Sequence, residues 1–370
     1  MSSALVPGAW TSLLTSLAGT RGAEWFPELD GAALTVRVEK ISARSRSTIT
    51  RLELSDGRRT RRAVAKLRQE APGEGRPARP GIVPEPLSAK EQAALEYRSL
   101  QNVYRRLGTA SEQLRAVRPL EHLPDEAGVV MEYVDATPGS RVLTSASRLL
   151  RYRRPDGAPS AEAMFRNAGT WLREFHAGTD DYRPSTRPGD DPAELFAKFE
   201  DYLGAWVGPG AARLAGAAGR VVPDILPDRP PTAVGHGDFA VRNLLVESSG
   251  RVCVIDAMPR WRVPVLEDLA RFLVGVRLQG LQVSSQGAAY SARFLDARER
   301  DFAEAYHAGQ PPAWEELQAY QLLILFDKWA ALTARRDRRG WRTSVPLSRL
   351  EDRYVAAEAR RLLTRLDRLP

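Results

Sequence analysis

The chain has 370 residues, a formal net charge of +8 and a hydrophobic content of 43%. This length is enough for two lobes and a large core, and the composition is ordinary for a soluble globular protein. The single cysteine, Cys253, excludes an intramolecular disulfide framework and fits a reducing compartment.

Hydropathy and charge also limit the partners. No apolar run approaches the roughly 18 residues of a transmembrane helix, so we expect no membrane partner. The apolar stretch 5–17 has no Lys or Arg before it and is interrupted by Pro7 and Gly8, so we expect no signal peptide and a cytoplasmic protein. A basic chain repels polycations, which gives no support to a highly cationic substrate. The sequence has no helix-turn-helix or zinc-finger pattern, so we expect no nucleic-acid partner.

The first third of the chain predicts a leading helix within 1–30 and then three strands, at 34–41, 48–54 and 62–67. The turn between the first two strands contains no glycine. The backbone amides of this turn and the hydroxyls of Ser45 and Ser47 can nevertheless hold phosphates.

The next segment, 70–88, is rich in Pro and Gly and predicts a linker without regular structure. A helix is then predicted from Ser88 to Leu107, because Ser88 and Glu91 have the spacing of a capping box. Two further strands are predicted at 114–120 and 128–134.

Helical patterns dominate after residue 134. Helices are predicted at 166–177, 193–206, 291–307, 314–335 and 347–369. We expect His176 to be a packed core residue, and we expect 178–192 and 208–231 to be irregular.

The segment 234–273 carries the strongest chemical signal. It contains His236-Gly237-Asp238, then Asn243, then a short apolar run that ends at Asp256. The runs 244–246 and 252–255 are predicted to pair as a hairpin through a turn at Gly250.

This set of side chains suits phosphoryl transfer. That reaction needs a carboxylate to orient a hydroxyl and accept its proton, and oxygen ligands to hold Mg²⁺ against the nucleotide phosphates. Asp238 is the candidate base, and Asn243 and Asp256 are the candidate metal ligands. A single Asp in such a position is usually a turn former or a cap, but three polar residues at this spacing favour a site.

The segment resembles the aminoglycoside phosphotransferase and choline kinase family. In that family HGD-x-x-x-x-N is followed by a strand ending in I-D and then by D-L-A. The chain has these as 236–243, Ile255-Asp256 and Asp268-Leu269-Ala270. The resemblance implies an α+β, protein-kinase-like fold with two lobes. These are a nucleotide-binding lobe at 1–134, with an antiparallel sheet, and a helical lobe at 135–370 that carries the catalytic segment and the acceptor site.

The resemblance also implies roles for other residues. Lys66, at the end of the third strand, would hold phosphates and pair with Glu96. His236 belongs to the catalytic loop and, with Asp268, would brace it. Backbone groups around Glu132 and Val134 would bind an adenine beside a gatekeeper, Met131.

The implied function is ATP-dependent phosphorylation of a hydroxyl on a small molecule, with Mg²⁺. GTP in place of ATP stays open, as does the acceptor, which could be an antibiotic, a sugar or a related metabolite. We expect a monomer or homodimer. The alternatives are a nucleotide-binding pseudokinase or scaffold and a protein kinase. The latter lacks support because the chain has no H-R-D, D-F-G or A-P-E motif.

Two basic features complete the predictions. Arg260 and Arg262 follow the metal-binding Asp and are candidates for acceptor contact. The cluster 335–339 closes a helix, where cations suit the helix dipole, so we expect a solvated face. The family often places an aromatic residue and an acid after I-D, whereas this chain has Ala257-Met258-Pro259, which indicates an unusual acceptor side.

Overall fold

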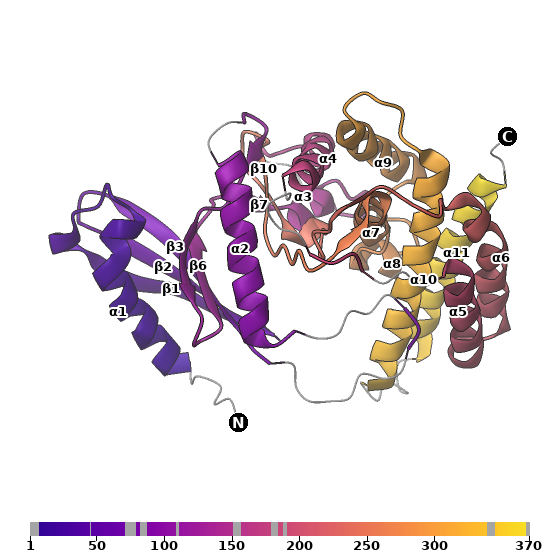
Figure 1. The fold of residues 1–370 in the computed structure, drawn as a ribbon, viewed down its shortest axis with the longest axis horizontal. Coiled ribbons are helices and arrows are strands. Elements are labelled where there is room, and N and C mark those ends of the chain that lie inside the picture. The colour runs from indigo at the N-terminus through magenta and orange to yellow at the C-terminus, as the bar shows by residue number, and fades with distance from the viewer. Residues whose placement is uncertain are drawn as a thin grey trace. The chain divides into compact units, whose positions relative to one another are not determined.

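The structure is a computed structural model, whose elements are labelled in Figure 1. It describes residues 7–44, 46–70, 79–81, 87–108, 111–150, 157–178, 184–187, 191–338 and 345–367. The chain divides into two compact units. Unit one comprises Met1–Gly75, Glu85–Asp135 and Val254–Met258, and unit two comprises Arg76–Pro84, Ala136–Cys253 and Pro259–Pro370.

Unit one is built on an antiparallel sheet of five strands in the order β1-β2-β3-β6-β5. The strands are β1 (Thr35–Arg44), β2 (Ser47–Ser55), β3 (Thr60–Arg68), β5 (Pro119–Leu123) and β6 (Gly128–Glu132), with a short β4 (Leu114–Arg115). Asp56 turns β2 into β3, since its Oδ1 accepts the amide hydrogens of Arg58 and Arg59, at 2.8 and 2.6 Å. Gly57 follows with a φ of 83°, which favours glycine.

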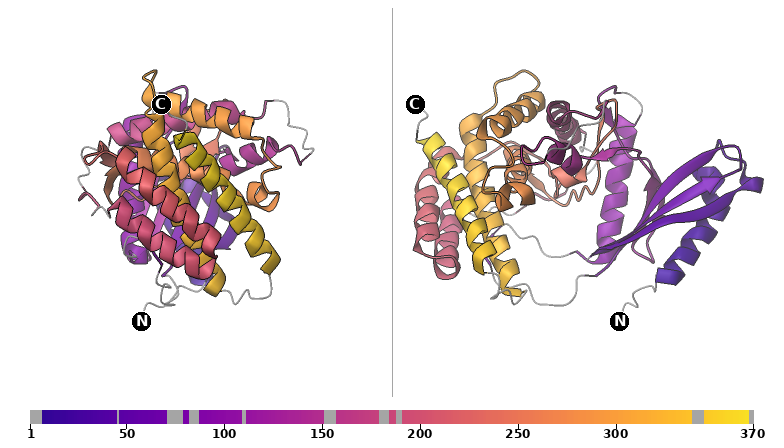
Figure 2. Two further views of the ribbon diagram at one scale, coloured as in Figure 1. Left: turned by 90° about the vertical axis from the view of Figure 1, so that its right-hand side faces the viewer. Right: turned by 180° about the vertical axis from the view of Figure 1, so that it is seen from behind.

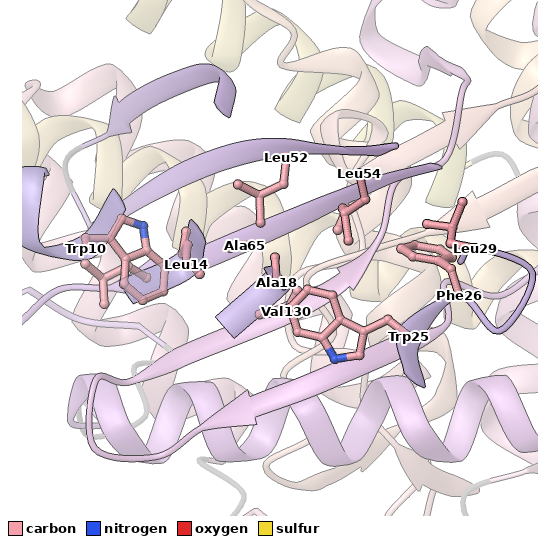
Figure 3. Close-up of a cluster of buried hydrophobic side chains, with 12 residues drawn as sticks. Trp10, Leu14, Ala18, Trp25, Phe26, Leu29, Leu52, Leu54, Ala65 and Val130 are labelled. Carbon is pink, nitrogen blue, oxygen red and sulfur yellow. The ribbon is translucent and has the colours of Figure 1, made fainter. Parts of the chain in front are cut away.

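Two helices cover the sheet of unit one. The helices α1 (Pro7–Trp25) and α2 (Ala89–Leu107) lie on opposite faces, as Figures 1 and 2 show. Figure 3 shows the apolar core of α1 and the sheet, where Trp10 and Trp25 pack with Leu52 and Leu54. The indole of Trp10 also donates to Thr50 Oγ1 at 3.2 Å, which satisfies a buried polar pair.

The predicted start of α2 is confirmed. Ser88 Oγ accepts the amide hydrogen of Glu91, while the Glu91 carboxylate accepts that of Ser88 at 2.8 Å, so the capping box is complete. Of the predicted linker before it, residues 71–78 and 82–86 lie outside the described residues.

Unit two is mainly helical. Its helices are α3 (Gly139–Ser145), α4 (Ala161–Ala177), α5 (Pro192–Trp206), α6 (Pro209–Ile225), α7 (Val265–Arg277), α8 (Gly280–Ser284), α9 (Ala292–His307), α10 (Trp314–Arg338) and α11 (Val345–Leu366). Figure 2 shows α5, α6, α10 and α11 packed together. Five short strands lie between these helices or before them. They are β7 (Thr137–Pro138), β8 (Thr232–Val234), β9 (Leu244–Val246), β10 (Val252–Val254) and β11 (Arg262–Pro264).

The prediction of an irregular stretch at 208–231 is wrong, because most of it forms α6. Pro209 occupies the first turn, where proline is tolerated, whereas Pro223 lies inside the helix, where it removes one intrahelical hydrogen bond. The buried positions Ala211, Ala215, Ala218 and Val222 recur every three or four residues and pack α6 against its neighbours. The glycines of the segment are typical of loops, which is why the sequence predicted irregular structure here.

The α+β prediction is confirmed, with a sheet in the smaller unit and helices in the larger one. Cys253 is buried in β10. Among the described residues, no helix is long and apolar enough to cross a membrane.

Candidate active site

The catalytic loop of unit two follows β8. The loop turns at Gly237, whose φ is 81°, and reaches a short 3-10 helix, η2 (Val241–Asn243), before β9. Asn243 is buried, and its amide nitrogen donates to Asp238 Oδ2 at 2.9 Å and to the Asp238 carbonyl at 2.8 Å. Arg242 contacts the other carboxylate oxygen of Asp238. The Asp238 side chain keeps 40% exposure, so a small molecule can reach it.

The loop is tied to α7 by Asp268. Oδ2 of this buried carboxylate accepts the backbone amide hydrogen of His236 at 2.6 Å. Burial alone would raise the pKa of Asp268, but hydrogen bonds from His176 and His236 outweigh burial and hold that pKa below its ordinary value. Asp268 therefore makes the contact with the loop that its expected bracing role requires.

His236 supports the loop from inside the core. It is fully buried, its ring packs edge-on against Trp171 and Phe239, and its Nδ1 accepts the amide hydrogen of Asp238 at 3.4 Å. Burial lowers its pKa to about 4. His236 is therefore neutral near pH 7, which suits a hydrogen-bond acceptor and excludes a cationic role.

His176 belongs to the same support. Its Nε2 lies 3.3 Å from Asp268 Oδ2 and its Nδ1 lies 2.7 Å from the hydroxyl of Tyr306. His176 packs in the core, as expected from the sequence. It also makes a polar contact with Asp268, which the sequence analysis did not predict. Its position at the end of α4 in Leu-Arg-Glu-Phe-His-Ala was the available signal.

Unit one holds a buried charge cluster. Lys66 Nζ lies 3.0 Å from Glu96 Oε1, so the expected ion pair forms, and Lys66 also contacts the Asp256 carboxylate. Arg68 donates to Glu96 Oε2 at 2.6 and 3.0 Å and lies 3.5 Å from Asp256 Oδ1. Burial alone would raise the pKa of Glu96, but the two cations outweigh it and hold the pKa below its ordinary value.

Arg68 was not among the sequence candidates. It stands two residues after Lys66 on β3, and residues i and i+2 of a strand face the same side of the sheet. That spacing was the signal. Asp256, the partner of both cations, has a φ of 64°, which is costly for a residue with a side chain.

The segment at 131–134 carries the candidate adenine contacts. Met131 is buried at the end of β6, beside Val64 of β3. The amide of Glu132 donates to the Arg118 carbonyl and its carboxylate contacts Arg115. The amide of Val134 makes no hydrogen bond with any described residue, so it can donate to a base.

The candidate phosphate turn is described in part. Ser47 is buried at the start of β2, paired in register with Arg44 and Arg68. Ser45 lies outside the described residues.

The site residues thus fall into two groups. Lys66, Glu96, Ser47, Met131, Glu132, Val134 and Asp256 lie in unit one, whereas His236, Asp238 and Asn243 lie in unit two. Within the described ranges, no three or more His, Cys, Asp or Glu side chains gather as a metal site. The donor set still fits Mg²⁺, which needs only one or two protein oxygens when phosphates supply others. Oδ1 of Asn243 accepts no hydrogen bond from the described residues.

The predicted basic features have structural partners. Arg262 donates to the Thr232 carbonyl at 2.8 Å, so it stabilises the pair β8–β11, and Arg260 lies over the Trp261 ring. In the cluster 335–339, Arg336 binds Glu351 at 2.8 Å and Asp352 at 2.7 Å, which joins α10 to α11.

The fold is that of a class of kinase-like phosphotransferases, as solved structures show. One is a choline/ethanolamine kinase family protein from Mesorhizobium loti, with 15% identity, coverage of 96% of this chain and 97% of that one, and a TM-score of 0.54. A macrolide 2′-phosphotransferase type I has 16% identity, coverage of 97% and 98%, and a TM-score of 0.51. An amicoumacin kinase in complex with AMP-PNP, Ca²⁺ and Ami has 12% identity, coverage of 96% and 93%, and a TM-score of 0.51.

The chain belongs to the phosphotransferase enzyme family, whose sequence model matches residues 40–256. This match spans β1 to Asp256 and includes the catalytic loop. A search of curated proteins found no match.

Proposed function

We propose that this protein is an ATP-dependent O-phosphotransferase that phosphorylates a hydroxyl of a small molecule. The observation that carries the proposal is the catalytic loop. There a half-exposed carboxylate, Asp238, is oriented by the buried amide of Asn243, and the loop is braced by Asp268. Membership of the phosphotransferase enzyme family supports the same reaction.

In the proposed reaction Asp238 orients the acceptor hydroxyl and takes its proton. The hydroxyl oxygen forms a bond to the γ-phosphorus, and the bond from that phosphorus to the departing ADP breaks. Exposure of Asp238 supports this role, because a base must lie within hydrogen-bond reach of the hydroxyl.

Asn243 and Asp256 would hold the metal ion in this proposal. Bound Mg²⁺ would neutralise charge on the phosphates. Oδ1 of Asn243, which accepts no hydrogen bond from the described residues, is a hard oxygen donor. The carboxylate of Asp256, which already pairs with cations, is another.

Lys66 would bind the phosphates. It is buried and shares two carboxylates, those of Glu96 and Asp256. A nucleotide phosphate would give Lys66 a new anionic partner and free Asp256 for the metal, while Glu96 keeps the lysine in place. The amide of Val134, which makes no hydrogen bond with any described residue, supports a contact with adenine in addition to the phosphate contacts.

The setting of the reaction is part of the proposal. A single buried cysteine fits the reducing cytoplasm. The solved structure of the amicoumacin kinase is a complex with AMP-PNP, an ATP analogue, which supports ATP as the proposed donor.

Replacement of Asp238 tests the reaction. We expect Asp238→Asn to bind Mg-ATP with nearly unchanged affinity but to lose at least about 10²-fold in kcat, since general base catalysis contributes that much. ADP release would be measured over a panel of hydroxylated acceptors, with Asp224→Asn as a matched control on the exposed face of α6.

Retention of wild-type turnover by Asp238→Asn would end the assignment of the base. Binding of Mg-ATP by the wild type without transfer to any acceptor would favour the pseudokinase alternative.

A further inference from the structure

Arg68 is a second cation on the strand that carries Lys66. It ends β3, two residues beyond Lys66, so the two side chains leave the same face of the sheet. Arg68 donates from Nε and Nη2 to Glu96 Oε2 at 3.0 and 2.6 Å, whereas Lys66 uses the other oxygen, Oε1. Both cations also contact Asp256, and Arg68 Nη2 lies 3.5 Å from its Oδ1. The candidate phosphate lysine therefore has a cationic neighbour with the same two carboxylate partners.

The guanidinium of Arg68 has donors that its present partners do not use. Its Nη1 group, which carries two N–H bonds, donates to no described residue. The contact between Nη2 and Asp256 is at the outer limit of a hydrogen bond, so it is weak and easily exchanged. The side chain keeps 13% exposure, so part of it can contact a ligand. Arg68 can thus bind an additional anion while it keeps its hydrogen bonds to Glu96.

The backbone of Arg68 lies beside the candidate phosphate turn. In the pairing of β2 with β3, Arg68 is the register partner of Ser47, where β2 begins. The next amide, that of Gln69, donates to the Arg46 carbonyl at 3.0 Å. The turn contains no glycine, and side chains limit how closely its amides can approach a phosphate. A guanidinium at this end of the sheet would supply donors that such a turn lacks.

The charge balance of the cluster changes when Asp256 binds a metal ion. In the structure Lys66 and Arg68 are balanced by two carboxylates, those of Glu96 and Asp256. With Asp256 committed to Mg²⁺, the two cations would share the single carboxylate of Glu96, and together these three side chains would be positively charged. A nucleotide phosphate is the anion that would then restore the balance.

We propose that Arg68 is a phosphate-binding residue of the nucleotide site, where it acts with Lys66 to hold the polyphosphate of the nucleotide. This inference rests on the proposed function, because it adds a residue to the nucleotide site of the same reaction. Glu96 positions both cations, one through each of its oxygens. The pair of cations would replace part of the phosphate contact that a glycine-rich loop makes in other phosphate-binding sites.

The number of phosphates on the ligand tests this role. Full-length protein with Mg²⁺ would be titrated by calorimetry with AMP and with AMP-PNP. We expect Arg68→Gln to weaken AMP-PNP binding about 10-fold or more, since a charge-assisted contact is lost, and to change AMP binding less than about 3-fold. Arg62→Gln is the matched control, because Arg62 lies on the same strand and pairs with Glu39 at 2.9 Å. It should leave both affinities unchanged.

A second variant, Arg68→Lys, separates the charge of Arg68 from its support of Glu96. Neither glutamine nor lysine can donate from both Nε and Nη2 to Glu96, so both variants should lower the midpoint of urea unfolding. Only the lysine keeps the positive charge, so we expect Arg68→Lys to bind AMP-PNP within about 3-fold of the wild type. AMP-PNP affinities that follow the midpoints and not the charge would overturn the proposal.

The outcomes distinguish this proposal from the proposed function. Unchanged AMP-PNP affinity in Arg68→Gln would show that no phosphate contacts the guanidinium, and equal losses for AMP and AMP-PNP would show that Arg68 only supports the shape of the site. Either result would overturn the role of Arg68 and leave the phosphotransferase intact. A wild type that binds AMP-PNP through Arg68 but transfers phosphate to no acceptor would refute the proposed function alone.

Discussion

Glu96 is the residue on which the charge cluster of unit one depends. It is 2% exposed and binds Lys66 through one oxygen and Arg68 through the other. A buried carboxylate shared by two cations is stabilising only while all members are present, because each removed partner leaves charge without compensation.

Removal of that carboxylate gives a residue-scale prediction. We expect Glu96→Gln to lower the free energy of unfolding by about 3 to 5 kcal/mol, since two cations would stay buried. Glu91→Gln, on the same helix, should cost less than about 1 kcal/mol, because glutamine at this position also completes a capping box. Urea unfolding of both variants measures the contrast, and similar losses would contradict the structural role of Glu96.

The pKa of His236 predicts a pH dependence. Its folded value of about 4 lies below the ordinary 6.5, so the unfolded chain binds more protons between these two values. Stability therefore rises with pH through this window and is lost as pH falls from 6.5 toward 4. The integrated effect is roughly 3 kcal/mol.

The contribution of His236 can be isolated with His236→Asn, whose side-chain oxygen can still accept the Asp238 amide hydrogen. The difference in unfolding free energy between wild type and variant should shrink by roughly 3 kcal/mol from pH 6.5 to pH 4. Carboxylates that titrate in the same range are common to both proteins and cancel. A constant difference would show that His236 is not held neutral.

At the scale of elements, α4 and α9 approach closely at Gly169. A Cβ atom there would lie 2.2 Å from the backbone oxygen of Phe302. We expect Gly169→Ala to destabilise the protein by about 1 to 3 kcal/mol or more, because the helices must separate.

Gly275 on α7 is the matched control, because a Cβ there meets no atom within 4 Å. Gly275→Ala should stabilise the protein by roughly 0.5 to 1 kcal/mol through helix propensity. Thermal unfolding of both variants would show opposite shifts. A neutral Gly169→Ala would mean that α4 and α9 are not in close contact.

At the scale of the whole molecule, the proposed metal ligands come from different units, Asp256 from unit one and Asn243 from unit two. Mg-AMP-PNP at about 100 times its Kd should stabilise the wild type by roughly 2.7 kcal/mol. We expect Asp256→Asn and Asn243→Ala each to lose the Mg²⁺-dependent part of this stabilisation.

The measurement is the midpoint of unfolding with AMP-PNP, with and without Mg²⁺. Asp224→Asn is the control and should respond as the wild type does. If Asn243→Ala kept its full Mg²⁺ response, Asn243 would not be a ligand of the metal ion.

The features that the sequence predicted correctly depend on the spacing of residues that lie close together in the chain. The capping box at Ser88, the strand ending at Lys66 and the loop from His236 to Asn243 each depend on residues a few positions apart, whose geometry the backbone dictates. The wrong prediction of an irregular stretch at 208–231 has the same origin. Glycine and proline are locally typical of loops, and the helix α6 forms because its buried face packs against neighbouring helices.

The sequence by itself determined the fold class and the polar residues of the catalytic loop. Only the tertiary structure decided which distant side chains support them. Arg68 reaches Glu96 across 28 positions and His176 reaches Asp268 across 92. Pairing of charges depends on distance and burial, and for residues far apart in sequence both are properties of the folded chain.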